Sequence, residues 1–204
     1  NIPTIGINMG RLGFLSNVNM DKIEYLFINL QQGNYIVEKR MLLELQCPNR
    51  CTTSFALNDI VIHRLAYSGL ITVDVTIDGQ HLNSYWGDGV IIATPTGSTS
   101  YSFSCGGPIV YPNLEAFIIT PIASHTMTVR PIVIPVGKME IKVSGRDDKF
   151  VLSKDSENVE LPVVDTIIVQ KADFCVNIVR LNNQNFYDIL NEKLMWGVDK
   201  RKLL

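Results

Sequence analysis

The sequence has few cysteines and no long apolar run. Its four cysteines, Cys47, Cys51, Cys105 and Cys175, are too few and too scattered for a disulfide framework. Cys47 and Cys51 have no second pair or histidine cluster to complete a metal site, so we expect no metal in this chain. No stretch approaches 18 uninterrupted apolar residues, and the opening Asn1-Ile2-Pro3 lacks a basic, signal-like region. We therefore expect a cytoplasmic protein with reduced thiols.

An excess of positive charge is also missing. Eighteen Lys and Arg residues stand against 20 Asp and Glu residues, for a net charge of −2, so no global field favours nucleic acid or an anionic membrane. Hydrophobic residues make up 46% and charged residues 19%, as in ordinary globular proteins. We expect a folded domain or pair of domains with neither a nucleic-acid nor a membrane partner.

What the sequence does have is a hydroxyl-rich stretch between two glycine-rich turns, from Gly87 to Pro108. A short apolar run, Val90–Ala93, predicts a buried strand and is followed by a turn at Thr94-Pro95-Thr96-Gly97. Ser98 or Thr99 could cap a short helix that Gly106-Gly107-Pro108 ends. Eight of the eleven residues from Thr94 to Ser104 carry a hydroxyl. We expect backbone N–H groups to converge there on an anionic or polyhydroxyl ligand, and the sequence is not a Walker loop because it has no lysine.

The remaining pattern predicts a chain of mixed class, α/β at its ends and all-β between them. Asp21 to Gln32 carries a helical apolar stripe of Ile23, Leu26, Phe27 and Leu30, with Asp21 and Glu24 as a capping pair. A second stripe starts at Phe186, with Asn182 or Asn183 as cap. Ten strands, which favour a sandwich-like domain, are predicted at Arg40–Gln46, Ala56–His63, Leu70–Asp78, Val90–Ala93, Phe117–Thr120, Met127–Ile134, Met139–Ser144, Phe150–Lys154, Thr166–Lys171 and Phe174–Leu181. Hairpin turns are predicted at Asp78-Gly79 and Arg146-Asp147-Asp148, and a tight turn at Gly10 and Gly13.

Five motifs together resemble the NAD kinases, which phosphorylate NAD to NADP. TPTGSTSYSFSCGGPI at Thr94–Ile109 resembles their glycine-rich signature, and the other four agree in order: GINMGRLGFL at Gly6–Leu15, ALNDIVI at Ala56–Ile62, PIASHTMTVRPIVIP at Pro121–Pro135 and FYDILNEKLMWG at Phe186–Gly197. The resemblance implies three parts. Residues 1–36 would be the C-terminal part of an α/β domain, 37–181 a β-sandwich NAD-binding domain, and 182–204 a C-terminal helix that packs on the α/β domain.

The resemblance also implies a set of NAD-binding residues. An amide beside a carboxylate at Asn58-Asp59 can read an adenine edge and ribose hydroxyls, although a polar strand edge facing water is equally compatible with the sequence. Asp88, between two glycines, matches an acid of the dinucleotide site, and Tyr101 could stack on an adenine ring. The implied NAD-binding residues are Asn58, Asp59, Asp88, Thr99, Ser100, Tyr101, Ser102, Phe103, Ser104 and Glu157, with His125 and Trp86 as further candidates.

The implied reaction is transfer of a phosphoryl group from ATP, or from polyphosphate, to the adenosine ribose 2′-hydroxyl of NAD. Mg²⁺ would arrive with the donor, and relatives assemble as homodimers or homotetramers. The family's GGDG motif, whose aspartate is its general base, does not occur in these 204 residues. The catalytic residue is therefore unknown, and we expect this chain alone to be inactive. Two alternatives stay open: a related diacylglycerol- or sphingosine-type lipid kinase, and a non-catalytic dinucleotide-binding sensor.

Overall fold

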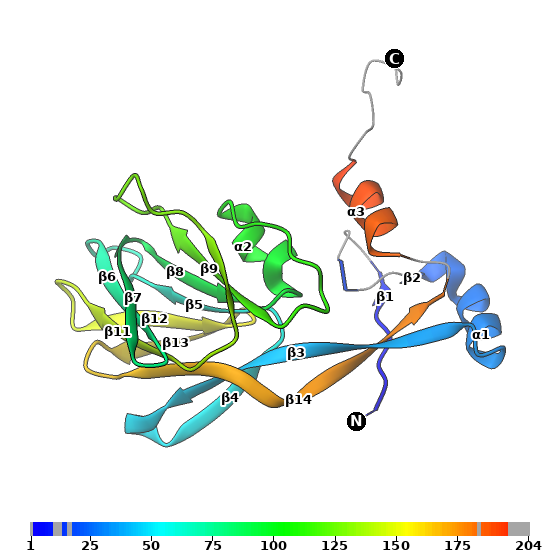
Figure 1. Cartoon of the computed structure of the whole chain (residues 1–204), viewed down its shortest axis with the longest axis horizontal. Helices are drawn as coiled ribbons and strands as arrows, with labels where there is room; N and C mark the ends of the chain where they lie inside the picture. The colour runs from blue at the N-terminus through cyan, green and yellow to red at the C-terminus, as the bar shows by residue number, and fades with distance from the viewer. Residues whose placement is uncertain (1, 10–13, 16–17, 183–184, 196–204) are drawn as a thin grey trace, which may run out of the picture. The chain divides into compact units, whose positions relative to one another are not determined.

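A computed structural model of the chain describes residues 2–9, 14–15, 18–182 and 185–195. The chain divides into two compact units (Figure 1). Unit 1 comprises residues 1–39 and 176–204, and unit 2 comprises residues 40–175. The predicted turn at Gly10 and Gly13 lies outside the described residues, as does Asn183.

Two antiparallel sheets of six strands each form the framework of unit 2. The first has the order β10 (Ile132–Pro135), β9 (Ala116–Ile122), β8 (Gly89–Ala93), β5 (Asp59–His63), β12 (Lys149–Lys154) and β13 (Glu157–Pro162). The second has the order β4 (Thr52–Ala56), β3 (Tyr35–Cys47), β14 (Ile167–Leu181), β11 (Met139–Ser144), β6 (Ile71–Ile77) and β7 (Gln80–Gly87). A 3₁₀ turn at Pro48–Arg50 links β3 to β4. Of the predicted mixed class, the large all-β part is confirmed.

The main core is made by alternate residues of both sheets. Ile60 and Ile62 of β5, Val73 and Val75 of β6, and Phe150 of β12 are fully buried members of one apolar cluster. Successive side chains of a strand point to opposite faces, so the odd-numbered residues of β5 lie on the other face of their sheet. That outer face carries the candidate site.

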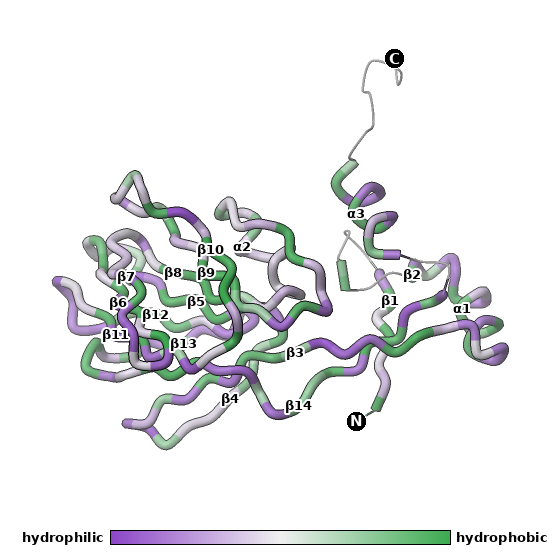
Figure 2. Tube along the Cα trace, in the orientation of Figure 1, coloured by the Kyte–Doolittle hydropathy of each residue, from purple (hydrophilic) through white to green (hydrophobic). Residues whose placement is uncertain are grey.

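The first sheet is covered on its outer face as well. Val61, Ile91 and Ile118 form a second apolar cluster with Val110, which comes from the segment after β8. This segment contains a 3₁₀ turn at Gly97–Thr99 and the four-residue helix α2 (Tyr101–Ser104), drawn in green in Figure 1. Figure 2 shows β5, β8 and β9 as predominantly apolar, as expected for strands buried on both faces.

Unit 1 has a small core of its own. β1 (Ile7–Asn8) pairs in parallel with β2 (Val18–Asn19), and a 3₁₀ turn at Met20–Lys22 leads into α1 (Ile23–Gln31). Val18, Leu26 and Leu181 are buried together. The last helix, α3 (Phe186–Leu194), is capped by Asn185, whose side chain accepts a hydrogen bond from the main chain of Asp188 at 2.8 Å.

Several local predictions are wrong in detail. The cap of α3 is Asn185 rather than Asn182, and α1 begins after a 3₁₀ turn without a side-chain cap, so Asp21 and Glu24 form no capping box. Phe27 is more than half exposed although it belongs to the predicted stripe. The turn at Arg146-Asp147-Asp148 is not a hairpin, because β11 and β12 belong to different sheets.

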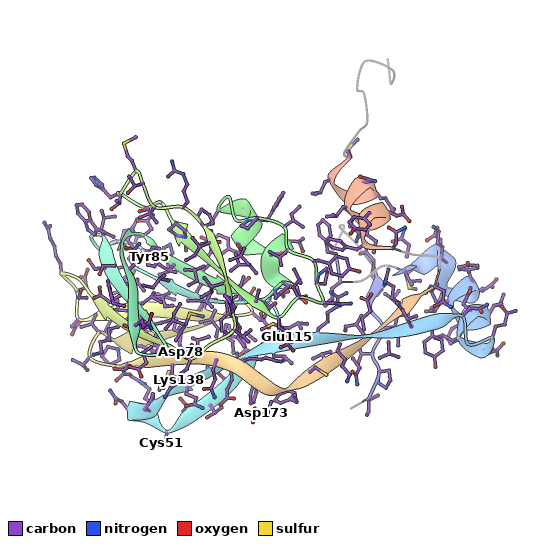
Figure 3. All side chains as sticks on the ribbon, viewed as in Figure 1. Cys51, Asp78, Tyr85, Glu115, Lys138 and Asp173 are labelled. Atoms are coloured by element: carbon purple, nitrogen blue, oxygen red, sulfur yellow. The ribbon has the colours of Figure 1, made fainter. Side chains whose placement is uncertain are left out.

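The other predicted hairpin is confirmed. Asp78 and Gly79 both have positive φ, 48° and 80°, as a two-residue turn between β6 and β7 requires. The carboxylate of Asp78 also accepts a hydrogen bond from the main chain of Lys138 at 2.9 Å, and Figure 3 labels both residues. This bond ties the hairpin to the strand that follows Gly137.

Gly97 provides a test of the contact between the hydroxyl-rich segment and β5. A Cβ at Gly97 would lie 2.0 Å from the carbonyl oxygen of Asn58, whereas one at Gly69 would meet nothing nearer than 3.6 Å. Gly97→Ala should therefore lower the free energy of unfolding by roughly 2–3 kcal/mol, since main-chain atoms must move. Gly69→Ala is the control and should change it little. Equal stability of the two variants in urea denaturation would contradict the close approach.

Candidate functional site

A pocket of about 430 Å³ opens on the outer face of the first sheet in unit 2. Its residues come from β5 and the turn before it, from β12 and β13 with the turn between them, from the loop after β5, and from the start of α2. They are Asn58, Asp59, Val61, His63, Arg64, Ala66, Ser100, Tyr101, Val151, Ser153, Asp155, Ser156 and Asn158. Such a volume suits a small organic ligand or part of a larger one.

Strand register builds the floor of this pocket. Val151 pairs with His63 and Ser153 with Val61, while Ser153 also pairs with Asn158 on the other side. These residues share one face because they are opposite one another in adjacent strands. The floor is apolar at Val61 and Val151 and polar around them, an arrangement suited to a flat ring with polar substituents.

Asp59 is the most unusual group in the pocket. Its side chain is only 6% exposed, and its Oδ2 atom has no hydrogen-bond partner among the described residues. The pKa of Asp59 is raised from 3.8 to about 6, mainly by burial and also by the neighbouring carboxylate of Asp155, while a hydrogen bond from Ser100 opposes the shift. A buried acceptor without a partner is costly to the folded protein, so a ligand that donates a hydrogen bond here would relieve that cost.

The turn after β8 fixes the position of Asn58. The main chain of Thr94 donates to the carbonyl of Asn58 at 2.9 Å, and the Thr94 hydroxyl donates to the carbonyl of Leu57 at 2.6 Å. The hydroxyl of Thr94 also accepts from the main chain of Gly97 at 3.0 Å. Thr96, next in line, keeps its Oγ1 atom buried without a partner among the described residues. Thr96 does not line the pocket.

The predicted convergence of free N–H groups is wrong. The N–H groups of Gly97, Ser98 and Ser100 donate within the turn itself, to Thr94, Pro95 and Gly97. Ser98 caps no helix; its hydroxyl donates to Pro95 at 2.7 Å and accepts from Val110 at 3.0 Å. Since α2 has only four residues, it offers no helix terminus for an anion. The predicted stop is present, with Gly106 at φ 83°.

The hydroxyl-rich run divides between the pocket and the protein interior. Ser100 and Tyr101 line the pocket. Ser102 is fully buried, and its hydroxyl shares a hydrogen bond with that of Thr120 at 2.8 Å. Thr99, Phe103 and Ser104 lie outside the lining, because successive residues of a helix point in different directions. The structure therefore gives Ser102 a packing role.

Asp88 is not part of the pocket lining but lies next to Arg64, which is. The Nε atom of Arg64 donates to Oδ1 of Asp88 at 2.5 Å, and the main chain of Arg64 donates to the carbonyl of Asp88 at 2.9 Å. The flanking glycines are needed there: a Cβ at Gly87 or Gly89 would lie 2.8 Å or 2.0 Å from a backbone oxygen. Asp88 is therefore held in place on both its main chain and its side chain.

The remaining candidates lie elsewhere on unit 2. The rings of Trp86 and His125 pack against each other with centroids 4.4 Å apart, and the main chain of His125 donates to Trp86 at 2.9 Å. Glu157 is exposed and pairs with Lys154 at 2.9 Å. None of the three lines the pocket, so their roles stay predictions.

The predicted site residues omit nine of the thirteen residues that line the pocket, among them His63, Arg64, Ser153, Asp155 and Asn158. The two-residue alternation of β5 could have placed Val61 and His63 on the face of Asp59, since Ile60 and Ile62 are apolar. The Nδ1 atom of His63 donates to the carbonyl of Arg64 at 2.7 Å, which fixes the orientation of the ring. Ser153 and Asn158 reach the pocket because their strands pair with their neighbours in this register. No local sequence pattern shows which strands pair.

The described residues contain no group of three or more His, Cys, Asp or Glu side chains that could hold a metal ion. In the same part of the chain, no helix has both the length and the apolar character needed to cross a membrane.

Fold and pocket together are those of a ligand-binding β domain, and comparisons with known proteins specify its class. Residues 57–181 match the family described as the ATP-NAD kinase C-terminal domain. The NAD kinase of Flavobacterium psychrophilum is 42% identical over 205 residues, covering 98% of this chain and 70% of the relative. The NAD kinase of Cytophaga hutchinsonii is 42% identical with the same coverage.

Solved structures agree with the sequence relatives. The yeast NADH kinase complexed with NADH superimposes with a TM-score of 0.86 at 28% identity, over 97% of this chain and 61% of the yeast chain. An NAD kinase from Archaeoglobus fulgidus in complex with ATP gives a TM-score of 0.78 at 28% identity, over 95% of this chain and 74% of the other. The chain thus spans under two thirds of the yeast chain.

The chain belongs to the NAD kinase family. This confirms the resemblance inferred from the sequence, and with it the prediction of an NAD kinase.

The raised pKa of Asp59 predicts a pH-dependent stability. Below about pH 4 both the folded and the unfolded chain hold this proton; between about pH 4 and 6 only the unfolded chain releases it, which favours unfolding. Above pH 6 the full cost, about 3 kcal/mol, is present. Asp59→Asn should therefore be more stable than the wild type at pH 8, with a difference that shrinks toward pH 4.

Thermal unfolding between pH 4 and pH 8 measures that difference. Asp173→Asn, at an exposed carboxylate labelled in Figure 3, controls for the loss of one negative charge. A stability gap between Asp59→Asn and wild type that stays constant with pH would refute the assignment.

Proposed function

We propose that this chain supplies the NAD-binding part of an NAD kinase, which transfers a phosphoryl group to the adenosine ribose 2′-hydroxyl of NAD. The observation that carries the proposal is the pocket at Asn58-Asp59, where a buried carboxylate oxygen lacks a hydrogen-bond donor. Ribose hydroxyls and the amino groups of a dinucleotide are such donors. The yeast relative in complex with NADH adds support.

The proposed binding mode follows from the chemistry of the pocket walls. Asn58 both donates and accepts, Asp59 accepts, and the Tyr101 ring offers a stacking surface at the entrance. Asp88 supplies a further acceptor, because Arg64 engages Oδ1 and leaves Oδ2 for a ligand. We keep Thr99, Phe103, Ser104 and Glu157 as candidates for the remaining dinucleotide contacts, and Trp86 with His125 as a candidate aromatic wall.

Catalysis by such an enzyme is mainly positioning and charge stabilisation. The pocket residues of this chain would hold the acceptor ribose and exclude water. The donor would be ATP, as suggested by the Archaeoglobus relative in complex with ATP, or polyphosphate. Mg²⁺ would come bound to the donor phosphates, as is usual in phosphoryl transfer.

A lipid kinase fits the pocket less well. A lipid acceptor needs a largely apolar cleft, whereas this pocket carries Asp59, Asp155, Asn58 and Asn158.

We further propose a cytoplasmic enzyme that assembles as a homodimer or homotetramer through unit 2. The exposed Phe55 and Phe174, whose ring centroids lie 4.7 Å apart, offer an apolar patch for such assembly. Residues 1–36 and 182–204 would belong to the α/β domain of the complete enzyme.

Two substitutions in the full-length protein test the binding mode. Asp88→Asn and Tyr101→Ala should each weaken NAD binding by roughly 1–3 kcal/mol, because each removes a contact that water replaces only in part. Isothermal titration calorimetry measures the loss, with Asp173→Asn and Tyr67→Ala as exposed controls. Unchanged affinity in both site variants would remove the basis for placing NAD in this pocket.

A turnover assay tests where the catalytic base lies. The 204-residue chain should form NADP at least 10² to 10⁴ times more slowly than the full-length protein, since general-base help is worth about that factor. Comparable turnover by the two proteins would place the base within these residues. Asp59, with its pKa of about 6, would then be the first candidate.

A further inference from the structure

Asp155 is the residue on which the geometry of Asn58 and Asp59 depends. It lies in the turn between β12 and β13, and its carboxylate accepts three main-chain hydrogen bonds. Oδ2 accepts from Leu57 at 2.6 Å, while Oδ1 accepts from Asn58 at 2.8 Å and from Asp59 at 3.1 Å. The main chain of Asp155 in turn donates to the carbonyl of Asp59 at 3.2 Å.

The turn that presents this carboxylate is strained. Asp155 and Ser156 have φ values of 43° and 77°, the positive values that the two-residue hairpin turn between β12 and β13 requires, although neither residue is glycine. Such strain costs free energy and persists only where the surrounding structure fixes it, most often at functional sites. Here the pairing of β12 with β13 and the four hydrogen bonds to residues 57–59 fix it.

Asn58 and Asp59 are therefore held from two sides. Thr94 and Gly97 pack on the carbonyl of Asn58, and Asp155 binds the N–H groups of residues 57–59. The carboxylates of Asp155 and Asp59 are close enough to repel each other. The side chain of Asp155 thus orients Asn58 and Asp59 and also acts electrostatically on the carboxylate of Asp59.

We propose that Asp155 is a positioning residue of the NAD site, which orients Asn58 and Asp59 through their main chain and biases Asp59 electrostatically. The inference rests on the proposed function. Removal of the Asp155 charge should lower the pKa of Asp59, so that Asp59 remains an acceptor for NAD at more acidic pH. The other charged or titratable groups around the pocket, namely His63 and Arg64 at the end of β5, Tyr101 of α2 and Asp88, are common to all variants compared.

The experiment measures NAD affinity of the full-length protein at pH 8 and pH 5.5 by calorimetry. Asp155→Asn should bind NAD about tenfold more weakly than wild type at pH 8, because an amide cannot accept all three N–H bonds. At pH 5.5 that gap should narrow to a few-fold. Asp155→Glu keeps the charge but displaces it, so it should be weaker than wild type at both values by a similar factor.

Asp148→Asn, at the exposed connection that precedes β12, is the matched control and should behave as wild type. Wild-type affinity in Asp155→Asn and Asp155→Glu would overturn the inference, as would a loss in Asp155→Asn that is equal at both pH values. Should Asp155→Asn fail to fold, the Asp155→Glu comparison decides alone: unchanged affinity overturns the inference. Absence of NAD binding by the wild type would instead reject the proposed function.

Discussion

The site depends on one close approach, in which Gly97 packs directly on the main chain of Asn58. No side chain fits there, since a Cβ would lie 2.0 Å from the Asn58 carbonyl oxygen. This contact, with the two hydrogen bonds from Thr94, joins the end of β8 to the start of β5. It brings Ser100 and Tyr101 over the outer face of the sheet, opposite Asp59. Without it the pocket would lose the wall formed by Ser100 and Tyr101.

The hydroxyl groups of this segment mostly build the structure. Thr94, Ser98 and Ser102 use theirs to satisfy buried partners, whereas Ser100 and Tyr101 line the pocket. The folded protein also carries a cost at Asp59, whose buried carboxylate lacks a donor. Such local cost is typical of sites whose polar groups are completed by substrate. The same groups that destabilise the free protein are those expected to bind NAD.

Much of the fold was predictable, for reasons that particular strands make plain. β6 was predictable because its residues alternate between buried and half-buried. For β11, the predicted range Met139–Ser144 equals the observed one. β7 and β13 were missed because both are edge strands with few buried residues, so they carry little hydrophobic pattern. Asn58, Asp59, Ser100 and Tyr101 were predicted to form one site and line one pocket. Ser153, Asn158 and Asp155 join them through strand register and a turn, which depend on contacts distant in sequence.

The central claim is that the pocket at Asn58 and Asp59 binds NAD. A crystal structure of the full-length protein with NAD tests it most directly. We expect the dinucleotide to lie against the outer face of β5, with a donor group on Oδ2 of Asp59 and the Tyr101 ring beside a base. Dinucleotide bound elsewhere, with Oδ2 of Asp59 still lacking a donor, would contradict the account.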